Sequence, residues 1–372
     1  MMPQILAVRS ALPGNRSGQA ELTRAFADRG NLSPADRELL TRRHAAAAVD
    51  SRHTALPVAE CAALQGVEAV NDRYITEATA LGERALRGAL SAAGLSPADL
   101  DLLIVTSVTG VAVPSLDARL IPRLGLRPDI RRLPIFGLGC VAGAAALGRL
   151  HDYLLGWPGQ TAALLAVELC SLNWPTIEIT PADMVAAGLF GDGAVALIAR
   201  GGRAGTAGDA ADGAAGRETA GGAAAQPRGP RVIASRSAVY PDSADALGWR
   251  LRTDCFRIVL TTELSAVVEG ALADSVSGFL AEHELTTDDI ASWICHPGGP
   301  KVIDAVQRAL KLPDSAMAAS RRSLAEVGNM SSASVLHILE MISDTERPPA
   351  GSPGLMIGLG PGVSAELVLL RW

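Results

Sequence analysis

Apolar and polar positions along the chain predict two similar runs of elements. Residues 99–126 contain an apolar stretch typical of a buried strand, then a Gly/Pro turn and an amphipathic helix. Residues 289–312 repeat this order. A helical pattern precedes each unit, over roughly 76–93 and 262–282, and each half ends in a glycine-rich segment followed by an apolar strand, at 194–199 and 365–370. The pattern indicates an α/β chain built from two related βαβ-type halves.

A stretch rich in Gly and Ala, residues 201–230, separates the two halves. It lacks an apolar period and is typical of a flexible surface loop. We therefore divide the chain into an N-terminal half, 1–230, and a C-terminal half, 231–372. Two such halves packed against each other would place their strand ends, and any site there, at a shared interface.

Composition narrows the classes of partner. The chain has 372 residues, of which 48% are hydrophobic and 19% charged, so it can bury a large core. Its net charge of −6 argues against nucleic acid as a main partner. Five cysteines without paired spacing indicate reduced thiols in a cytoplasmic protein. The first residues lack the apolar core of a signal peptide, and no apolar run approaches the length of a membrane span, so we expect no stable membrane insertion.

Cys140 follows a glycine turn and lies in the first turn of a predicted helix rich in small residues. The positive end of a helix favours a thiolate over a thiol. Lowering the thiol pKa from about 8.5 to about 6 takes roughly 3.4 kcal/mol, of which a helix dipole supplies about 1–2 kcal/mol. A cationic neighbour, most naturally a histidine, would supply the rest.

Two further motifs supply groups that a reactive cysteine needs. His296 lies where a buried strand ends in Cys-His-Pro-Gly-Gly-Pro (295–300), and Asn329 lies in Gly-Asn-Met-Ser-Ser-Ala-Ser (328–334). Taken singly, the first is an ordinary turn histidine and the second a helix cap. However, the small residues around Asn329 leave room for a reacting group. Cys, His and Asn together make a nucleophile, its base and ion-pair partner, and a pair of donors for an oxyanion.

Five motifs in order give the chain a family resemblance. Gly-Leu-Gly-Cys (137–140), Leu-Phe-Gly-Asp-Gly (189–193), His-Pro-Gly-Gly-Pro (296–300), Gly-Asn-Met-Ser-Ser-Ala (328–333) and Gly-Leu-Gly-Pro-Gly-Val (358–363) resemble those of type III polyketide synthases of the chalcone synthase superfamily. The resemblance implies a thiolase fold in five α-β-α-β-α layers, a homodimer, and no metal or organic cofactor. It implies acyl-CoA and malonyl-CoA as substrates. Cys140 would carry the chain as a thioester, while His296 and Asn329 would bind the malonyl carbonyl as CO2 leaves.

The resemblance also assigns residues to the reaction cavity and to the CoA entrance. Two phenylalanines match the family's gatekeepers, Phe190 and Phe256. The cavity wall and its variable lining would comprise Gly360, Pro361, Gly362, Cys170 and Asn173. Basic residues that could bind CoA phosphates are Arg42, Arg43, Arg52 and Lys301, although each arginine could equally lie on a solvated basic face.

Within the family, the motifs are more like those of bacterial alkylpyrone and alkylresorcinol synthases than of plant chalcone synthases. We therefore expect a medium- or long-chain fatty acyl-CoA starter, with a tetrahydroxynaphthalene synthase that uses malonyl-CoA alone as the alternative. A rival from another class is an NAD(P)-dependent oxidoreductase, since Gly137, Gly139, Ala142 and Glu168 make a passable dinucleotide fingerprint. That reading leaves His296 and Asn329 without a role. A second rival is a non-catalytic acyl-binding protein.

Overall fold

The computed structural model describes residues 2–202, 229–261 and 264–372. Nine strands in this part of the chain form one mixed sheet in the order β11-β12-β13-β8-β1-β7-β6-β4-β5. Their bounds are β1 Gln4–Ala11, β4 Leu102–Thr106, β5 Arg131–Ile135, β6 Thr161–Leu169, β7 Asp192–Arg200, β8 Arg231–Val239, β11 Ser292–Cys295, β12 Pro353–Gly360 and β13 Ser364–Arg371. The strands predicted at 194–199 and 365–370 lie within β7 and β13.

The strand pairing repeats between the two halves. β4 runs parallel to β6, β6 antiparallel to β7, and β7 antiparallel to β1. In the same way, β11 runs parallel to β12, β12 antiparallel to β13, and β13 antiparallel to β8. The two sets meet where Gln4 of β1 pairs with Arg231 of β8. This repetition confirms the prediction of two related halves.

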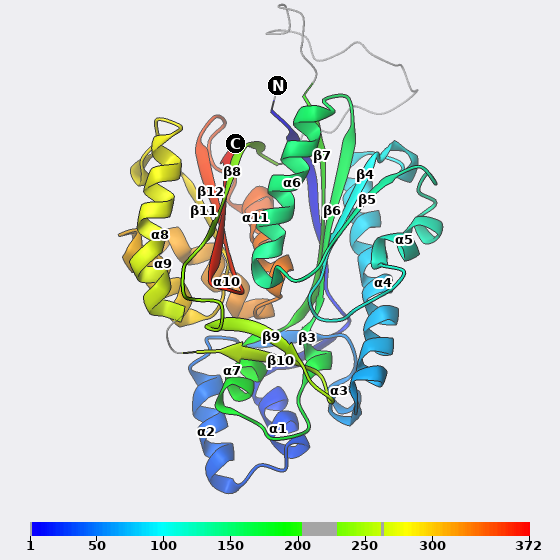
Figure 1. Cartoon of the computed structure of the whole chain (residues 1–372), viewed down its shortest axis with the longest axis vertical. Coiled ribbons are helices and arrows are strands. Elements are labelled where there is room, and N and C mark those ends of the chain that lie inside the picture. Colours follow the sequence, from blue (N-terminus) through cyan, green and yellow to red (C-terminus); the bar gives the residue numbers. More distant parts are fainter. Residues whose placement is uncertain (1, 203–228, 262–263) are drawn as a thin grey trace, which may run out of the picture.

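Helices form three layers around the two sets of strands (Figure 1). On one outer face, α4 (Val67–Ala93) packs against β1, β6 and β7, with α5 (Leu116–Leu124) beside it. Between the sets lie α6 (Ala142–Gly156) and α11 (Ser334–Thr345), which contact strands of both halves. The other outer layer comprises α8 (Leu264–Ala281), α9 (Pro300–Ala309) and α10 (Ala318–Val327). The five-layered α/β arrangement is therefore confirmed.

Two predicted boundaries need correction or fall outside the described residues. The helix expected from about residue 76 begins at Val67 as α4, because its first turns carry polar residues that hide the apolar period. The helix expected from 262 is α8, whose residues 262–263 lie outside the described part. Residues 203–228 of the expected surface loop also lie outside it. No helix within the described residues has the length and apolar character needed to cross a membrane.

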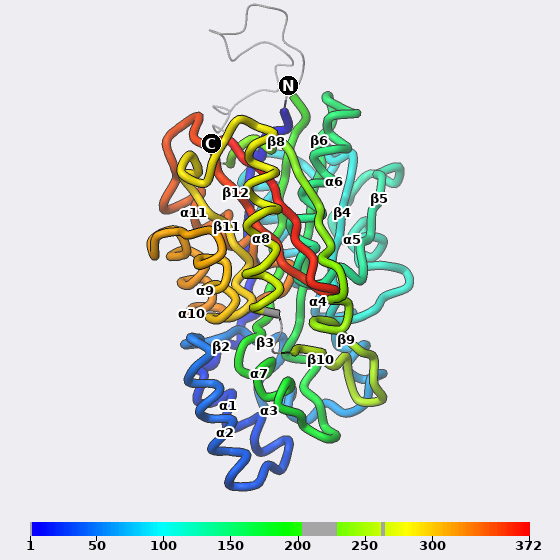
Figure 2. Tube along the Cα trace, turned by 60° about the vertical axis from the view of Figure 1, so that its left-hand side comes forward, coloured from blue at the N-terminus to red at the C-terminus, as the bar shows by residue number. Residues whose placement is uncertain are grey.

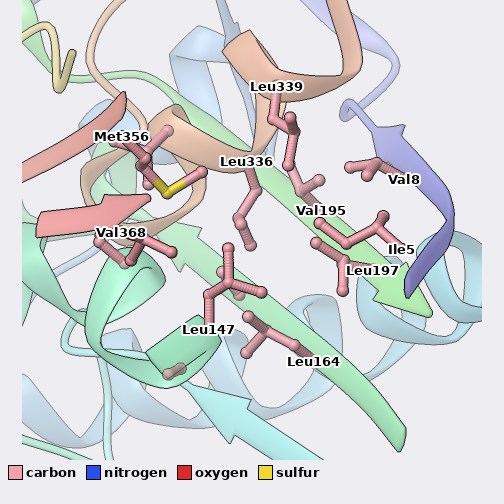
Figure 3. Packing of buried hydrophobic residues seen from close by; sticks show 14 of the residues in the cluster. Ile5, Val8, Leu147, Leu164, Val195, Leu197, Leu336, Leu339, Met356 and Val368 are labelled. Carbon is pink, nitrogen blue, oxygen red and sulfur yellow. The ribbon is translucent and has the colours of Figure 1, made fainter. Parts of the chain in front are cut away.

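The central helices are held by an aliphatic core (Figure 3). Leu147 of α6 and Leu336 and Leu339 of α11 pack with residues of strands from both halves. The strand residues labelled in that view are Ile5, Val8, Leu164, Val195, Leu197, Met356 and Val368. Since α6 follows Cys140 and α11 follows Asn329, this core fixes the two segments that carry the predicted site.

The remaining elements gather at one end of the molecule (Figures 1 and 2). They are the antiparallel strand pair β2–β3 and the hairpin β9–β10, with the helices α1, α2, α3 and α7. Their bounds are α1 Gln19–Arg29, α2 Pro34–Ala45, α3 Val58–Ala63, α7 Pro181–Leu189, β2 Asn15–Gly18, β3 Ser51–Thr54, β9 Leu247–Leu251 and β10 Phe256–Leu260. This end covers the strand ends and helix starts from which the site is built.

Candidate active site

Cys140 lies in a short 3₁₀ helix, Gly139–Val141, directly before α6. Its side chain is buried, and its Sγ lies 3.4 Å from the hydroxyl of Ser331. Ser331 belongs to the segment that begins α11, so this contact joins the starts of the two central helices. Sequence reasoning missed Ser331, because nothing in the chain indicates which side chain meets the cysteine.

Electrostatics around Cys140 differ from our expectation of a resting thiolate. Burial raises the pKa of the Cys140 thiol to about 12, and the nearby Glu168 carboxyl adds to the rise. Burial also lowers the pKa of His296 to about 3, which favours the neutral imidazole. Both shifts favour the neutral forms, a thiol and an imidazole, because burial removes the water around each group.

Asn329 is held by the backbone of the Leu189–Gly191 segment. Its N–H donates to the carbonyl of Leu189 at 2.8 Å, and its carbonyl accepts from the N–H of Gly191 at 3.0 Å. Its side-chain Oδ1 accepts from the N–H of Ser331 at 2.8 Å. This use of Oδ1 leaves the Nδ2 amide as the group that Asn329 can offer to a substrate oxygen.

His296 follows β11 directly, as the sequence predicts. Its N–H donates to the carbonyl of Ile357 in β12 at 2.9 Å, and its own carbonyl accepts from the N–H of Gly298 at 3.0 Å. The imidazole is 2% exposed, and its Nδ1 has no partner among the described residues. Leaving a buried ring nitrogen without a hydrogen bond costs free energy, so this nitrogen is a group that a ligand can bind.

The turn between β12 and β13 lies against the cysteine segment. A Cβ built on Gly360 would lie 2.7 Å from the backbone N of Val141, and one built on Gly139 would lie 2.6 Å from Pro361. These contacts place Gly360 and Pro361 directly behind the 3₁₀ helix of Cys140. Gly362 lies one residue further and donates its N–H to the carbonyl of Leu247.

Glu168 is fully buried behind Cys140 rather than exposed to a cofactor. Its carboxyl accepts from Ser332 Oγ at 2.5 Å, Thr109 Oγ1 at 3.0 Å and the N–H of Val108 at 3.0 Å. Burial raises its pKa to about 7. The acidic residue of a dinucleotide fingerprint has to reach a ribose hydroxyl, so the oxidoreductase reading is wrong.

Both gatekeeper candidates lie at one small cavity with Cys170 and Asn173. The ring of Phe190 lies 5.8 Å from that of Trp249 in β9, which also lines the cavity. Asn173 fixes the position of Phe256 in the cavity wall, since its Oδ1 accepts from the N–H of Phe256 and its Nδ2 donates to the Thr109 carbonyl. The cavity volume is about 20 Å³, which is room for about one water molecule.

The four basic candidates for CoA binding separate into different environments. Arg43 and Lys301 line one groove of about 440 Å³, which Leu189 and Gly298 also line. Arg42 projects from α2 into solvent and pairs with Glu38 at 2.7 Å. Arg52 is 2% exposed and bonds Phe190 and Gln19. The prediction that Arg52 binds a CoA phosphate is therefore wrong, since β3 turns its side chain into the protein.

Two family models cover almost the whole chain. The N-terminal domain of chalcone and stilbene synthases matches residues 4–202, and their C-terminal domain matches residues 231–372. The chain belongs to this family. It is a type III polyketide synthase and hence an acyltransferase, as the five motifs indicated, and this confirms the enzyme class against both rivals.

Individual relatives refine the comparison. A 1,3,6,8-tetrahydroxynaphthalene synthase from Streptomyces peucetius subsp. caesius is 51% identical, covering 99% of this chain and 93% of that protein. The crystal structure of a 1,3,6,8-tetrahydroxynaphthalene synthase from Streptomyces coelicolor A3(2) matches with a TM-score of 0.88 at 30% identity, covering 99% of both chains. An alpha-pyrone synthesis polyketide synthase-like protein from Mycobacterium tuberculosis is 30% identical over 73% of this chain and 65% of its own length. The comparisons favour our alternative over the alkylpyrone and alkylresorcinol reading.

Proposed function

We propose that this type III polyketide synthase makes 1,3,6,8-tetrahydroxynaphthalene from malonyl-CoA alone. The observation that carries the proposal is the 51% identity to a synthase of that name across nearly the full length of both proteins. The cavity beside Cys170 and Phe256 adds support, because its volume of about 20 Å³ is too small for a fatty acyl tail. A small malonyl-derived starter requires the least displacement of these walls.

In the proposed loading step, the Cys140 sulfur attacks the thioester carbonyl of the first malonyl-CoA. His296 takes the thiol proton and returns it to the departing CoA sulfur, so the new thioester forms as the old C–S bond breaks. The neutral imidazole of His296 can accept a proton, and its Nδ1 has no partner among the described residues. Because burial lowers the pKa of the ring, the proton transfer has to be coupled to attack on the carbonyl. The site would thus reach its ion pair only with substrate bound.

In the proposed extension step, the next malonyl-CoA loses CO2. The electron pair of the broken C–C bond stays on the thioester as an enolate, whose oxygen accepts hydrogen bonds from His296 and Asn329 Nδ2. The enolate carbon then attacks the Cys140 thioester, forming a C–C bond and releasing the cysteine sulfur. One loaded malonyl unit and four extender units carry about fifteen carbons, of which about five leave as CO2 once the starter carboxyl is also lost, so the ring carbons of the product remain.

We propose that CoA lies in the groove lined by Arg43 and Lys301. Leu189 lines this groove, and its carbonyl accepts the Asn329 N–H, so the groove adjoins the segment that pairs with Asn329. Arg43 and Lys301 would bind phosphate oxygens there, whereas the exposed Arg42 has an acidic partner already.

The test is product analysis with malonyl-CoA as the only substrate, compared with added lauroyl-CoA or coumaroyl-CoA. We expect the naphthalene product by mass spectrometry with malonyl-CoA alone and little change on adding either starter. Efficient alkylpyrone formation from lauroyl-CoA, with no product from malonyl-CoA alone, would restore the fatty-starter reading.

We also propose a homodimer that covers an apolar surface beside Cys140. Large apolar side chains are exposed in two neighbouring stretches, at Val111, Val113, Leu133, Phe136 and Leu138. β5, which carries Leu133, is an edge strand whose outer side has no partner in the described sheet. An apolar patch at an open edge is a surface that a second copy can cover.

We expect Phe136→Asp to shift the protein from dimer to monomer in analytical ultracentrifugation, because a buried charge would face the partner's apolar surface. Val239→Asp is the matched control, since Val239 is also exposed but lies at the end of β8, several strands from β5. A monomeric wild type, or a Phe136→Asp protein that stays dimeric, would contradict the proposal.

A further inference from the structure

Arg52 is a fully buried cation between the two segments that deliver Phe190 and Asn329. It lies in β3 and is 2% exposed. Its Nη1 donates to the backbone carbonyl of Phe190 at 2.7 Å, and its Nη2 donates to Gln19 Oε1 at 2.9 Å. No carboxylate forms an ion pair with it among the described residues, so the guanidinium donates its hydrogen bonds to a backbone carbonyl and a neutral amide.

The carbonyl that Arg52 holds belongs to the segment on which Asn329 is built. Leu189 accepts the Asn329 N–H, Gly191 donates to the Asn329 carbonyl, and Phe190 lies between them. Gln19, the other partner of Arg52, donates to the carbonyl of Gly188 at 2.8 Å. The guanidinium and its amide partner therefore fix both ends of the segment that pairs with Asn329.

The stem of Arg52 also fills the space beside Asn329. A Cβ built on Gly328 would lie 2.9 Å from Cγ and Cδ of Arg52 and 2.7 Å from the Leu189 carbonyl oxygen. Gly328 has a φ of +74°, a conformation that glycine adopts at little cost. The chain before Asn329 thus passes directly over the arginine, with no room for another side chain.

We propose that Arg52 is a positioning residue for the decarboxylation step, acting through the Phe190 carbonyl on the Asn329 amide. The inference rests on the proposed catalytic role of Asn329. A buried charge is costly unless its hydrogen bonds are made. The bonds of Nη1 and Nη2 hold the Leu189–Gly191 segment in place, while Nε has no partner among the described residues. The Asn329 donor follows this segment through its backbone pairing.

Burial lowers the pKa of Arg52 to about 10, which leaves the guanidinium charged at neutral pH. The nearby Asp192 carboxyl opposes that fall. The Asp192 carboxylate oxygens accept hydrogen bonds from the N–H and the hydroxyl of Ser171 and from the N–H of Ala55. The Arg52 guanidinium therefore bonds the Phe190 carbonyl rather than the Asp192 carboxylate.

The experiment measures kcat and KM for malonyl-CoA decarboxylation in Arg52→Met, Arg52→Lys, Asn329→Ala and the double variant Arg52→Met/Asn329→Ala. A misplacement of about 1 Å can cost about 100-fold in rate, so we expect Arg52→Met to lose about 10- to 100-fold in kcat with KM within about twofold. Arg52→Lys, which keeps the charge but not the fork, should lose less. In the Asn329→Ala background, Arg52→Met should cost less than about twofold, because the donor it positions is gone.

Arg29→Met is the matched control. Arg29 also donates to backbone carbonyls, those of Cys61, Ala62, Leu64 and Trp174, but it has no bond to the Leu189–Gly191 segment. We expect a lower melting temperature with kcat unchanged. Where Arg52→Met does not fold, Arg52→Lys and its double variant carry the same comparison.

Two outcomes overturn the inference in distinguishable ways. A native decarboxylation rate in Asn329→Ala would overturn the proposed role of Asn329 and the inference with it. A damaged Asn329→Ala together with a native kcat in the Arg52 variants, or an equal Arg52→Met loss in both backgrounds, would overturn the role of Arg52 alone.

Discussion

At the residue scale, burial favours the neutral thiol of Cys140, the nucleophile that we propose. Its sulfur faces the Ser331 hydroxyl, and the buried Glu168 opposes a second negative charge nearby. In the proposed loading step, the proton passes to His296 as the new C–S bond forms, so no free thiolate is needed beforehand. The helix start alone, which we expected to favour a thiolate, is outweighed by burial.

We expect Cys140→Ala to lose polyketide formation and to keep measurable malonyl-CoA decarboxylation, because His296 and Asn329 remain. Chain extension needs the thioester, whereas enolate formation needs only the two donors. The measurement is naphthalene product by mass spectrometry beside CO2 release.

Cys61→Ala is the control for this variant. Cys61 is also fully buried but lies in α3, and we expect its replacement to leave both activities in place. Native product formation by Cys140→Ala would show that another group carries the chain.

At the element scale, the site depends on how closely the β12–β13 turn approaches the 3₁₀ helix of Cys140. Local sequence predicted both elements and even their neighbourhood through the family motifs. It did not predict the direction of the Arg52 side chain, because a basic cluster near a helix end looks the same whether its members face solvent or the core. Likewise, the pairing of Phe190 with Asn329 joins residues far apart in the chain, which no local pattern contains.

The same limit applies to the cavity. Phe190, Phe256, Cys170 and Asn173 were all predicted to line it, and the structure brings them together. Trp249 completes the wall, although its strand, β9, carries no motif. The comparisons favour the alternative over a fatty starter. The composition of the chain could not decide between them, because cavity volume depends on how these side chains pack and not on the overall share of Ala, Val and Leu.

We expect Gly360→Ala to lower both stability and turnover. The new Cβ would lie 2.7 Å from the backbone N of Val141, so the turn or the Cys140 helix has to move. Overpacking of this kind costs about 1–3 kcal/mol. Chemical denaturation and kcat for product formation measure the two effects.

Gly270→Ala in α8 is the control, for which we expect the free energy of unfolding to rise rather than fall. A Cβ there meets no atom within 4 Å, and alanine in an exposed helix position gains up to about 1 kcal/mol over glycine. If Gly360→Ala were as stable and as active as wild type, the close packing of this turn would not matter to the site.

At the scale of the whole molecule, the candidate site lies where the two halves meet, and its polar side chains are buried there. The N-terminal half supplies Cys140 and Glu168, and the C-terminal half supplies His296, Asn329 and Ser332. The Glu168–Ser332 hydrogen bond crosses directly between the halves. The protonation state of Glu168 therefore links the assembly of the site to the folding of the whole chain.

This link makes a prediction for the pH dependence of stability. Burial raises the pKa of Glu168 from its ordinary 4.5 to about 7. Between these values the folded protein holds a proton that the unfolded chain has released, so the contribution is fully present below pH 4.5 and is lost as pH rises through 7. At about 1.36 kcal/mol per pKa unit, the loss reaches up to about 3 kcal/mol. Asp192, whose pKa burial raises to about 6, acts with the same sign.

We expect Glu168→Gln to reduce the loss of unfolding free energy as pH rises, because the amide cannot ionise. The hydrogen bonds from Thr109 and Val108 can persist on the amide oxygen. Relative to wild type, the variant should gain stability between pH 5 and pH 8, measured by urea denaturation at both values. Glu21→Gln on the exposed first turn of α1 makes the same charge change at the surface, and its effect should stay within about 0.5 kcal/mol. If Glu168→Gln changed the free energy of unfolding equally at pH 5 and pH 8, Glu168 would not carry the buried proton, and the loss of stability would belong to Asp192 or to another buried acid.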